Sequence, residues 1–544
     1  MSFLATPQQR MLFVSIGLGA IFGVLVARGA ILASSGPAEA PVAATSSEPQ
    51  ATVRANIVDR DGEVLVRSGQ GVSLAANPNL VWDAEGAAES LTTVFPGLKK
   101  DVIARRLANT AQQFVWIKRG LTEEQVDTVL ALELEGLIFR EEDIRIYPHG
   151  RLAGHTLGYV GRDGAGLAGI EYKFNERLTT DSEPLKLTLD VDVQYAVETE
   201  LASAADQYGL IGASGIVLDA ETGAVRAIAS WPSLDPSNPA PSTDPASTDR
   251  VVGSVYDLGS VFKPLIIAAA LETGAADESD RYDISAPLVI QKTEITDTHA
   301  IPGPVTLSDV ITESSNKGTV QVAWALGKPA QIDLFRRAGF FEKSPVELSV
   351  SQAPLVPPQW DELAYATTSY GHGISITPMV FATAFSSFAN KGLRVPPTLI
   401  ESEIGNGAAE RVFDADTVRR VNRMLRDTVL VGTGTRAAVP GYRVAGKTGT
   451  AEKPIDGVYD EDRNINSFAA FFPADRPEYV VLVVLDEPQD GTAGGVTAAW
   501  NAAPTAARII ERIAPHLGVM PVFADAPQLS PGETAALSDR SAMQ

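Results

Sequence analysis

Residues 257–274 read DLGSVFKPLIIAAALETG, a break in the chain followed by a long apolar run. The first three residues interrupt any preceding helix, and Gly274 ends the run. Pro264 falls in the first turn, where its missing N–H costs little. We therefore expect a helix whose N-terminus carries Ser260, with free backbone N–H groups that favour negative charge on Oγ. Lys263 shares that helix face and lies within reach of this hydroxyl.

The pattern Ser-x-x-Lys occurs twice, because SSNK at residues 314–317 fits it as well. Only the first match opens an apolar helical run. A lysine whose pKa is depressed by burial beside another cation can act as the base for a serine. The plainer interpretation makes Ser260 an ordinary N-cap and Lys263 a surface charge, and this match alone favours that plainer interpretation.

Two further motifs follow, SSN at residues 314–316 and KTGT at residues 447–450. The second comes after residues 442–445, which we expect to form an edge strand. It offers a lysine cation and two threonine hydroxyls to an anionic substrate terminus, and its glycine would let a ligand approach the backbone closely. The alternative is a glycine-containing strand end with one exposed lysine.

The order and the spacing of the three motifs favour function. Ser260 precedes Ser314 by 54 residues, and Asn316 precedes Lys447 by 131. Together they match the S-x-x-K, S-x-N and K-T-G set of enzymes that acylate a serine with a D-Ala-D-Ala peptide or a β-lactam. The set supplies a nucleophile, a base, a proton relay and a carboxylate anchor.

The composition excludes several other classes of protein. At 544 residues, with 45% hydrophobic and 20% charged residues, the chain is expected to fold into two or three domains. A net charge of −23 argues against nucleic-acid binding. Cysteine is absent and the five histidines show no ligand spacing, so we expect no metal site and no cofactor.

The N-terminal segment carries the membrane signal. Residues 11–27 hold no charge, and the apolar character resumes after Arg28. At about 1.5 Å per residue, residues 11–33 can span a hydrocarbon core of roughly 30 Å if Arg28 snorkels to the interface. We expect a single-pass anchor after a cytoplasmic tail of residues 1–10, with the remaining chain exported. The alternative is a cleaved signal peptide.

Composition divides the rest of the chain. We expect an Ala/Pro-rich linker at residues 34–51, a non-catalytic domain at 52–183, a catalytic domain at 184–520 and a disordered tail at 521–544. Strands near both ends of the catalytic domain enclose a helical insert, which indicates an α/β (α+β) domain with an antiparallel sheet covered by helices. The expected strands are residues 57–59, 64–66, 185–189, 215–218, 224–229, 467–472 and 479–485, and the expected helices are residues 87–107, 122–132 and 192–207.

The chain resembles the class B penicillin-binding proteins, and within them the septal type of bacterial cell division. The resemblance extends from the membrane segment to about residue 517. Besides the three motifs it rests on RANIVDRDG at 54–62, FVWIKR at 114–119, RIYP at 145–148, LGYVG at 157–161, GLAGIE at 166–171, YDLG at 256–259 and GHGIS at 371–375. The segments before residue 183 favour the septal over the elongation type.

The resemblance implies a transpeptidase domain preceded by an elongated α+β pedestal domain and one transmembrane helix. It implies that Ser260 attacks the penultimate D-Ala carbonyl of a donor stem peptide, that Lys263 takes the proton, and that the terminal D-Ala leaves. Ser314 and Lys447 would relay the proton to the leaving amine. Asn316 would hydrogen-bond the substrate or Lys263.

The KTGT motif would bind the substrate. The resemblance assigns the terminal carboxylate to Thr448 and Thr450, beside Gly449, and the oxyanion hole to the backbone N–H groups of Ser260 and Thr450. An amine from a neighbouring stem peptide would then resolve the acyl-enzyme into a cross-link. The implied partners are peptidoglycan stem peptides, β-lactams, a membrane glycan polymerase and other division proteins. The implied location is the inner membrane, with the catalytic domain in the periplasm.

Several alternatives stay open. An elongation-type transpeptidase shares the site, a D,D-carboxypeptidase or β-lactamase has the triad without the N-terminal domain, and a division scaffold or β-lactam sensor keeps the fold without turnover. The chain departs from the family in its very short cytoplasmic tail and its long linker. We interpret His155, His299 and His372 as structural.

Overall fold

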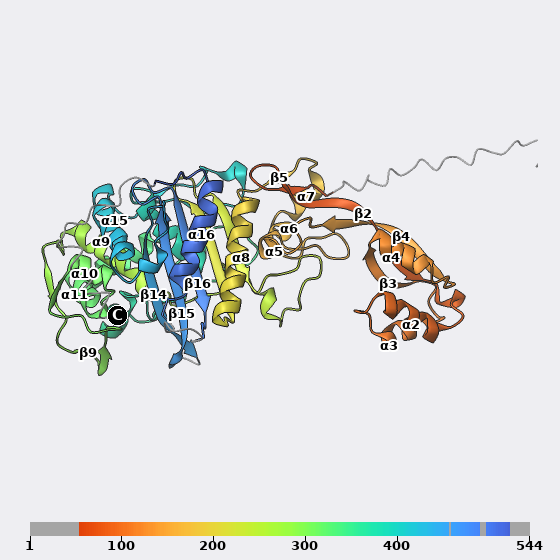
Figure 1. Ribbon diagram of the computed structural model, residues 1–544, viewed down its shortest axis with the longest axis horizontal. Coiled ribbons are helices and arrows are strands. Elements are labelled where there is room, and N and C mark those ends of the chain that lie inside the picture. Colours follow the sequence, from red (N-terminus) through yellow and green to blue (C-terminus); the bar gives the residue numbers. More distant parts are fainter. Residues whose placement is uncertain (1–53, 456–457, 490–496, 523–544) are drawn as a thin grey trace, which may run out of the picture. The chain divides into compact units, whose positions relative to one another are not determined.

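The computed structural model describes residues 54–455, 458–489 and 497–522, and Figure 1 traces their helices and strands. The expected anchor and linker, and nearly all of the expected tail, lie outside these residues. Within them, no helix is long and apolar enough to cross a membrane. The domain boundary expected near residue 184 stays a prediction.

A five-stranded antiparallel sheet forms the centre of the C-terminal region, in the order β14-β15-β16-β6-β7. Its strands are β6 (Gly212–Asp219), β7 (Val225–Trp231), β14 (Ala445–Ile455), β15 (Val458–Phe472) and β16 (Tyr479–Asp486). Strands from the two ends of the region meet where β16 pairs with β6, as the sequence predicts. The edge strand expected at residues 442–445 is misplaced. Strand β14 begins only at Ala445, and the KTGT motif lies inside it, paired with β15.

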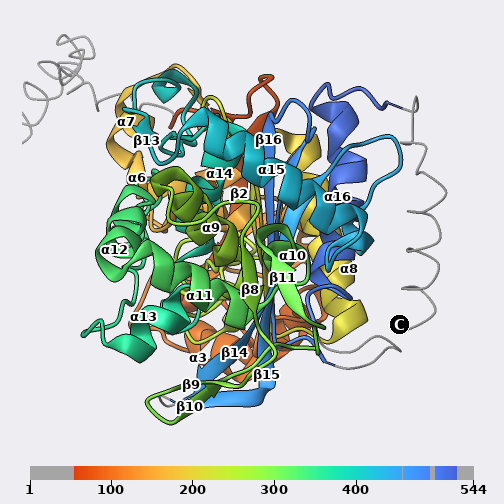
Figure 2. The same cartoon turned by 90° about the vertical axis from the view of Figure 1, so that its left-hand side faces the viewer.

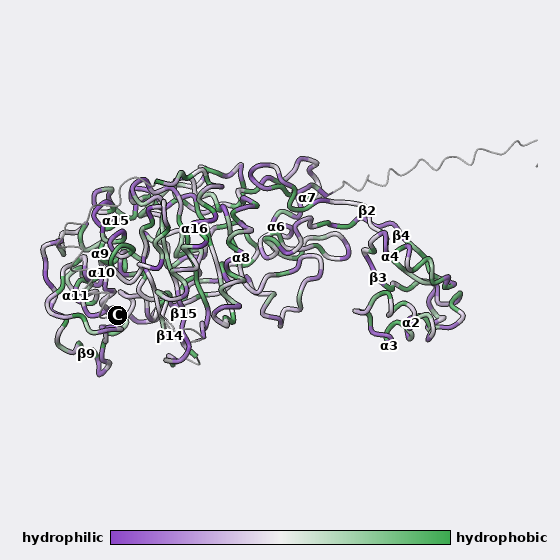
Figure 3. The backbone as a smooth tube through the Cα atoms, viewed as in Figure 1, coloured by the Kyte–Doolittle hydropathy of each residue, from purple (hydrophilic) through white to green (hydrophobic). Residues whose placement is uncertain are grey.

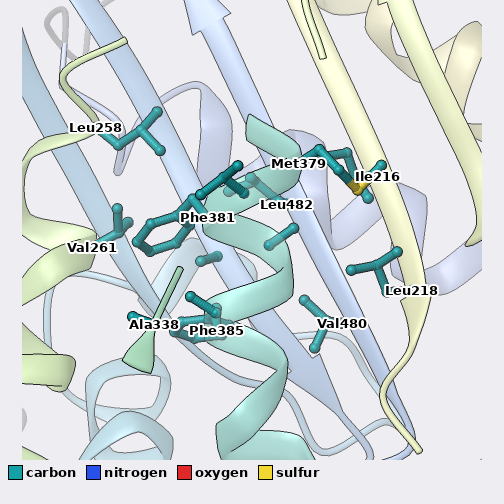
Figure 4. Close-up of a cluster of buried hydrophobic side chains, with 14 of the residues drawn as sticks. Ile216, Leu218, Leu258, Val261, Ala338, Met379, Phe381, Phe385, Val480 and Leu482 are labelled. Atoms are coloured by element: carbon teal, nitrogen blue, oxygen red, sulfur yellow. The ribbon is translucent and has the colours of Figure 1, made fainter. Parts of the chain in front are cut away.

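The sheet is covered by helices on both faces, because its strands alternate between two cores. In β16 the side chains of Val480, Leu482 and Val484 join one core and those of Val481, Val483 and Leu485 join the other. Figure 4 shows the first core, where Phe381 and Phe385 of α14 (Pro378–Ala389) lie against the sheet. Helices α8 (Val191–Tyr208) and α16 (Ala502–His516) cover the opposite face.

Helix α9 (Lys263–Thr273) lies inside the first core. Its residues from Lys263 to Leu271 are all buried, which is the burial expected of a helix that is apolar on every side (Figure 3). Figure 2 looks onto the helices packed around it. They are α10 (Leu307–Thr312), α11 (Asn316–Leu326), α12 (Lys328–Arg337) and α15 (Ala415–Leu430). Helix α13 (Glu362–Thr368) packs against α11.

Short strands and single turns connect these helices. They are β8 (Arg281–Asp283), β9 (Leu288–Ile290), β10 (Thr293–Ile295), β11 (Pro304–Thr306), β12 (Leu393–Arg394), β13 (Glu410–Arg411), η2 (Pro245–Ser247), η3 (Gly259–Phe262), η4 (Glu401–Glu403) and η5 (Thr435–Ala437). Three antiparallel pairs form among them: β8 with β11, β9 with β10, and β12 with β13. The β9–β10 hairpin follows α9 and leads toward the SSN motif.

The N-terminal region builds a second sheet around the long strand β2, which pairs with β1, β3 and β4. Its elements are β1 (Ile57–Val58), β2 (Val64–Ala76), β3 (Val115–Leu121), β4 (Leu137–Ile146), β5 (Leu185–Lys186), η1 (Pro78–Leu80), α2 (Ala84–Val94), α3 (Lys100–Leu107), α4 (Glu123–Leu130), α5 (Gly154–Leu157), α6 (Gly169–Lys173) and α7 (Asn175–Thr180). The single helix expected over 87–107 is wrong, because Pro96 ends α2 and a turn separates it from α3.

Three of the quoted N-terminal segments meet in one buried ion cluster. Glu171 is fully buried and accepts hydrogen bonds from Arg54 Nε at 2.5 Å and Arg145 Nε at 2.8 Å. Arg145 also donates to the Ala55 carbonyl at 2.9 Å, which joins β4 to the chain before β1. Burial lowers the pKa of Arg145, and the Glu171 carboxylate opposes that shift. These segments therefore hold the N-terminal region together.

Replacing the shared carboxylate should destabilise this region. We expect Glu171→Ala to lower the free energy of unfolding by about 3–5 kcal/mol, because two guanidinium groups then stay buried without their counter-charge. Glu176→Ala, which removes an exposed carboxylate from α7, is the matched control and should change little. Urea unfolding followed by tryptophan fluorescence measures both. An equal, small effect of the two substitutions would contradict the assigned role of the cluster.

Candidate active site

Ser260 lies in a single 3-10 turn, η3, that leads directly into α9. The backbone N–H of Lys263 donates to the Ser260 carbonyl, and Pro264 occupies the first turn of α9, where no N–H is needed. The sequence predicts the serine at a helix N-terminus, and the structure places it one turn earlier. Its side chain is half-buried and remains open to a reactant.

The turn η3 packs closely against strand β14. A Cβ atom on Gly449 would lie 2.3 Å from the Leu258 carbonyl oxygen, which also accepts a 2.9 Å hydrogen bond from Ser467 Oγ of β15. Gly259 has φ of +65°, and its Cβ would lie 2.6 Å from the Thr450 carbonyl oxygen. A glycine at position 449 therefore lets the serine turn pack against the strand. Its expected part in the approach of a ligand stays a prediction.

Lys447 points from β14 into the interior. Its side chain is fully buried, and its Nζ donates to Ser314 Oγ at 2.9 Å and to the Thr448 carbonyl at 2.9 Å. Burial lowers the pKa of Lys447 from 10.5 to about 7. Near neutral pH this amine therefore exchanges a proton readily, and no carboxylate binds it directly in the part of the chain that the structure describes.

Lys263 approaches the same hydroxyl from α9. Its Nζ lies 3.2 Å from Ser314 Oγ and also donates to the Ser314 carbonyl. Burial holds the pKa of Lys263 well below its usual value, the neighbouring Lys447 lowers it further, and Asp297 raises it. The lysine is thus suited to act as a base. Within the described residues, Ser260 Oγ makes no hydrogen bond to it, and such contacts often tighten only when a reactant is bound.

Ser314 is the residue that joins the two lysines. Its hydroxyl lies within hydrogen-bond reach of both amines, and its backbone has φ of +63°, a conformation that non-glycine residues adopt at a cost. The residue ends the turn between α10 and α11. A proton can therefore pass between Lys263 and Lys447 through one hydroxyl.

Asn316 makes a contact that the sequence does not predict. Its Nδ2 donates to the Thr296 carbonyl at 2.8 Å, and it has no hydrogen bond to Lys263 in the described part of the chain. Its backbone N–H donates to Asp297 at 2.5 Å. Ser315 caps α11 and also donates to Asp297. Asp297 lies in no recognised motif, so its place under the SSN turn comes from the structure alone.

The two threonines of the KTGT motif have partners of their own. Thr448 Oγ1 lies 2.9 Å from Thr433 Oγ1, in the loop after α15, and Thr450 Oγ1 accepts from the Ala498 N–H at 3.1 Å. Thr433 is a second residue that sequence analysis missed. These contacts hold the two hydroxyls in place, that of Thr448 buried and that of Thr450 half-buried.

The second Ser-x-x-Lys match does not form a catalytic pair. Lys317 directs its amine to the Ile284 carbonyl, away from the serine that precedes it by three residues. The histidines also have local partners: His155 Nε2 lies 3.0 Å from the Ala246 carbonyl, and His299 Nε2 lies 3.3 Å from Glu313. His372 packs between Tyr370 and Tyr459. The described residues contain no cluster of side chains that could hold a metal ion.

The arrangement is suited to acyl transfer at Ser260. It combines a half-exposed hydroxyl at the start of a helix, two buried amines of lowered pKa and a hydroxyl between them. The serine turn also lies against a strand that presents two threonine hydroxyls. Such a site can accept, hold and return one proton while an acyl group is bound.

Comparison with known proteins gives the family. Residues 213–511 match the family described as penicillin binding protein transpeptidase domain, and residues 49–200 match the penicillin-binding protein dimerisation domain. The chain is 36% identical over 484 residues to a probable peptidoglycan D,D-transpeptidase FtsI of Caulobacter vibrioides, which covers 86% of this chain and 82% of the relative. It is 30% identical over 477 residues to the peptidoglycan D,D-transpeptidase FtsI of Escherichia coli K12, covering 81% and 80%.

A solved structure matches the fold as well. Penicillin binding protein 3 from Mycobacterium tuberculosis, complexed with aztreonam, superposes with a TM-score of 0.67 at 26% identity. The match covers 87% of this chain and 98% of that chain. The match therefore extends over both the N-terminal and the C-terminal regions described above.

The lowered pKa of Lys447 predicts a pH-dependent stability. The unfolded chain, with an ordinary lysine pKa of 10.5, binds more protons than the folded chain between about pH 7 and 10, so the native protein gains stability as the pH rises through this window. Lys447→Met removes this dependence and abolishes acylation. The melting temperature of the variant should exceed that of the wild type most near pH 6, and this difference should narrow toward pH 9. A difference independent of pH would contradict the lowered pKa.

Proposed function

The chain belongs to the class B penicillin-binding proteins, and from that premise we propose that it is a peptidoglycan D,D-transpeptidase of septal wall synthesis. The observation that carries the proposal is the pair of buried lysines that share the Ser314 hydroxyl, beside the half-exposed Ser260. Its substrates are stem peptides that end in D-Ala-D-Ala, and β-lactams acylate the same serine.

In the first half of the reaction Ser260 Oγ attacks the carbonyl carbon of the penultimate D-Ala, and Lys263 takes the hydroxyl proton. The backbone N–H groups of Ser260 and Thr450 stabilise the oxyanion. The C–N bond then breaks, and the departing amine of the terminal D-Ala receives a proton through Ser314 and Lys447. The acyl group stays on Ser260 as an ester.

In the second half an amine from a neighbouring stem peptide attacks the ester carbonyl. It loses one proton to the same relay, and Ser260 Oγ recovers its proton as the new amide forms. Thr448 and Thr450 bind the terminal carboxylate of the donor peptide before the first step, with Lys447 close behind them. Asn316, which donates to the Thr296 carbonyl, holds the turn that carries Ser314.

The setting of the reaction follows from the N-terminal segment and the relatives. We propose a single membrane anchor at residues 11–33 and a catalytic domain in the periplasm, where stem peptides are found. The two relatives named FtsI support the septal role over the elongation role. A membrane glycan polymerase and other division proteins are the proposed partners.

The N-terminal region argues against the simpler members of the superfamily. A D,D-carboxypeptidase or a β-lactamase needs the triad alone, whereas residues 49–200 of this chain match a penicillin-binding protein dimerisation domain. Rapid hydrolysis of a chromogenic cephalosporin would favour a β-lactamase.

Removing the nucleophile tests the proposal. Ser260→Ala should abolish covalent labelling of the full-length protein by a fluorescent penicillin, and cells that depend on this copy should form filaments because septa cannot be cross-linked. Gel fluorescence and microscopy measure the two effects.

The matched control is Ser242→Ala, an exposed serine of the same region. The Ser242→Ala protein should be labelled by the penicillin like the wild type, and cells that carry it should divide normally. Covalent labelling of the Ser260→Ala protein would refute the assigned nucleophile, round cells in place of filaments would indicate an elongation role, and normal division would indicate a scaffold.

A further inference from the structure

Asp297 lies directly beneath the SSN motif, at the end of the β9–β10 hairpin. Its carboxylate accepts hydrogen bonds from Ser315 Oγ at 3.1 Å, from the Asn316 N–H at 2.5 Å and from the Lys317 N–H at 3.2 Å. It therefore satisfies backbone donors of the first turn of α11 that the helix itself leaves free. The carboxylate comes from a separate segment of chain, so it ties that segment to the turn.

Packing fixes the position of this carboxylate. Ile290 and Ile295, on the two strands of the hairpin, are buried in a cluster with Val320 of α11. The carbonyl of the next residue, Thr296, accepts from Asn316 Nδ2 at 2.8 Å. The hairpin and the start of α11 thus form one unit, and Asp297 cannot move without moving the motif.

This restraint acts on Ser314. It immediately precedes the bonded residues, has φ of +63°, and must keep its hydroxyl between two amines. A backbone in this region persists only where its surroundings hold it. The hydrogen bonds to Asp297 supply that restraint on the C-terminal side of the turn.

The charge of Asp297 also acts on the relay. The ionisable groups around the SSN turn are Lys263 from α9, Lys447 from β14, Lys317 from α11, and the Glu313–His299 pair at the rim. Lys317 is bonded to the Ile284 carbonyl. Asp297 is the carboxylate that raises the pKa of Lys263, against the lowering by burial and by Lys447.

We propose that Asp297 is a positioning residue for the transpeptidase reaction, which both holds the Ser314 turn and provides the negative charge that faces the Lys263–Ser314–Lys447 relay. This inference rests on the proposed function and extends it to a residue outside the three motifs. Asp297 touches no reacting atom, so it acts through Ser314 and Lys263.

The test is the pH profile of acylation of the full-length protein by a fluorescent penicillin. In Asp297→Asn an amide oxygen can still accept from the Asn316 N–H, but the charge is lost. We expect a plateau rate lower by about 10-fold or more, because the relay loses its alignment. We also expect the acid limb to move to lower pH by on the order of one unit, because the Lys263 amine deprotonates more easily without the nearby carboxylate.

Two further variants separate charge from structure. Ser315→Ala removes a hydrogen bond to Asp297 but keeps the charge, so it should lower the plateau without moving the acid limb. Glu294→Gln removes an exposed carboxylate from the same hairpin and should match the wild type. If the acid limb of the Asp297→Asn profile lies at the same pH as that of the wild type, the proposal is contradicted.

Other outcomes are equally informative. An Asp297→Asn protein that melts below the assay temperature would also contradict the proposal, because Asp297 would then be a residue of general stability. If the wild type itself is not labelled at Ser260, the proposed function fails. If the wild type is labelled and Asp297→Asn behaves identically, only this inference fails.

Discussion

A serine hydroxyl held between two buried lysine amines is the interaction on which the rest of this structure depends. Lys263 and Lys447 are both fully buried, and Ser314 Oγ is the acceptor that they share. Two such cations repel each other in a medium of low dielectric constant, so burial favours loss of a proton from one of them. The same arrangement that costs stability therefore creates a base and a relay near neutral pH.

The fold keeps these groups in place by rigid burial. Helix α9 is enclosed by the first core, which fixes Lys263, while β14 is hydrogen-bonded along its length to β15, which fixes Lys447. Gly449 allows the serine turn to pack closely on that strand, so Ser260 and the KTGT motif are held against each other. Ser314 lies in the turn between α10 and α11, and Asp297 holds the C-terminal side of that turn.

Much of this could be predicted from the sequence, and the exceptions have physical reasons. Short apolar runs on either side of a turn predicted the hairpins of the central sheet, and the motif order predicted a site containing Lys263, Ser314 and Lys447, whose amines and hydroxyl the structure brings together. Local patterns could not give the partner of Asn316, nor the place of Asp297, since each contact joins segments about 20 residues apart through a hairpin fold. The close packing of Gly449 could not be predicted either, because its neighbour is backbone 191 positions away and no local signal reports such a contact.

The most direct measurement is a pH titration of the full-length protein labelled with 13C at the lysine Cε, followed by NMR. The account predicts a resonance that titrates near pH 7, is lost in Lys447→Met, and shifts when a β-lactam acylates Ser260. If every lysine resonance instead titrates near 10.5, the two buried amines carry ordinary charges, and the proton relay described for this site is wrong.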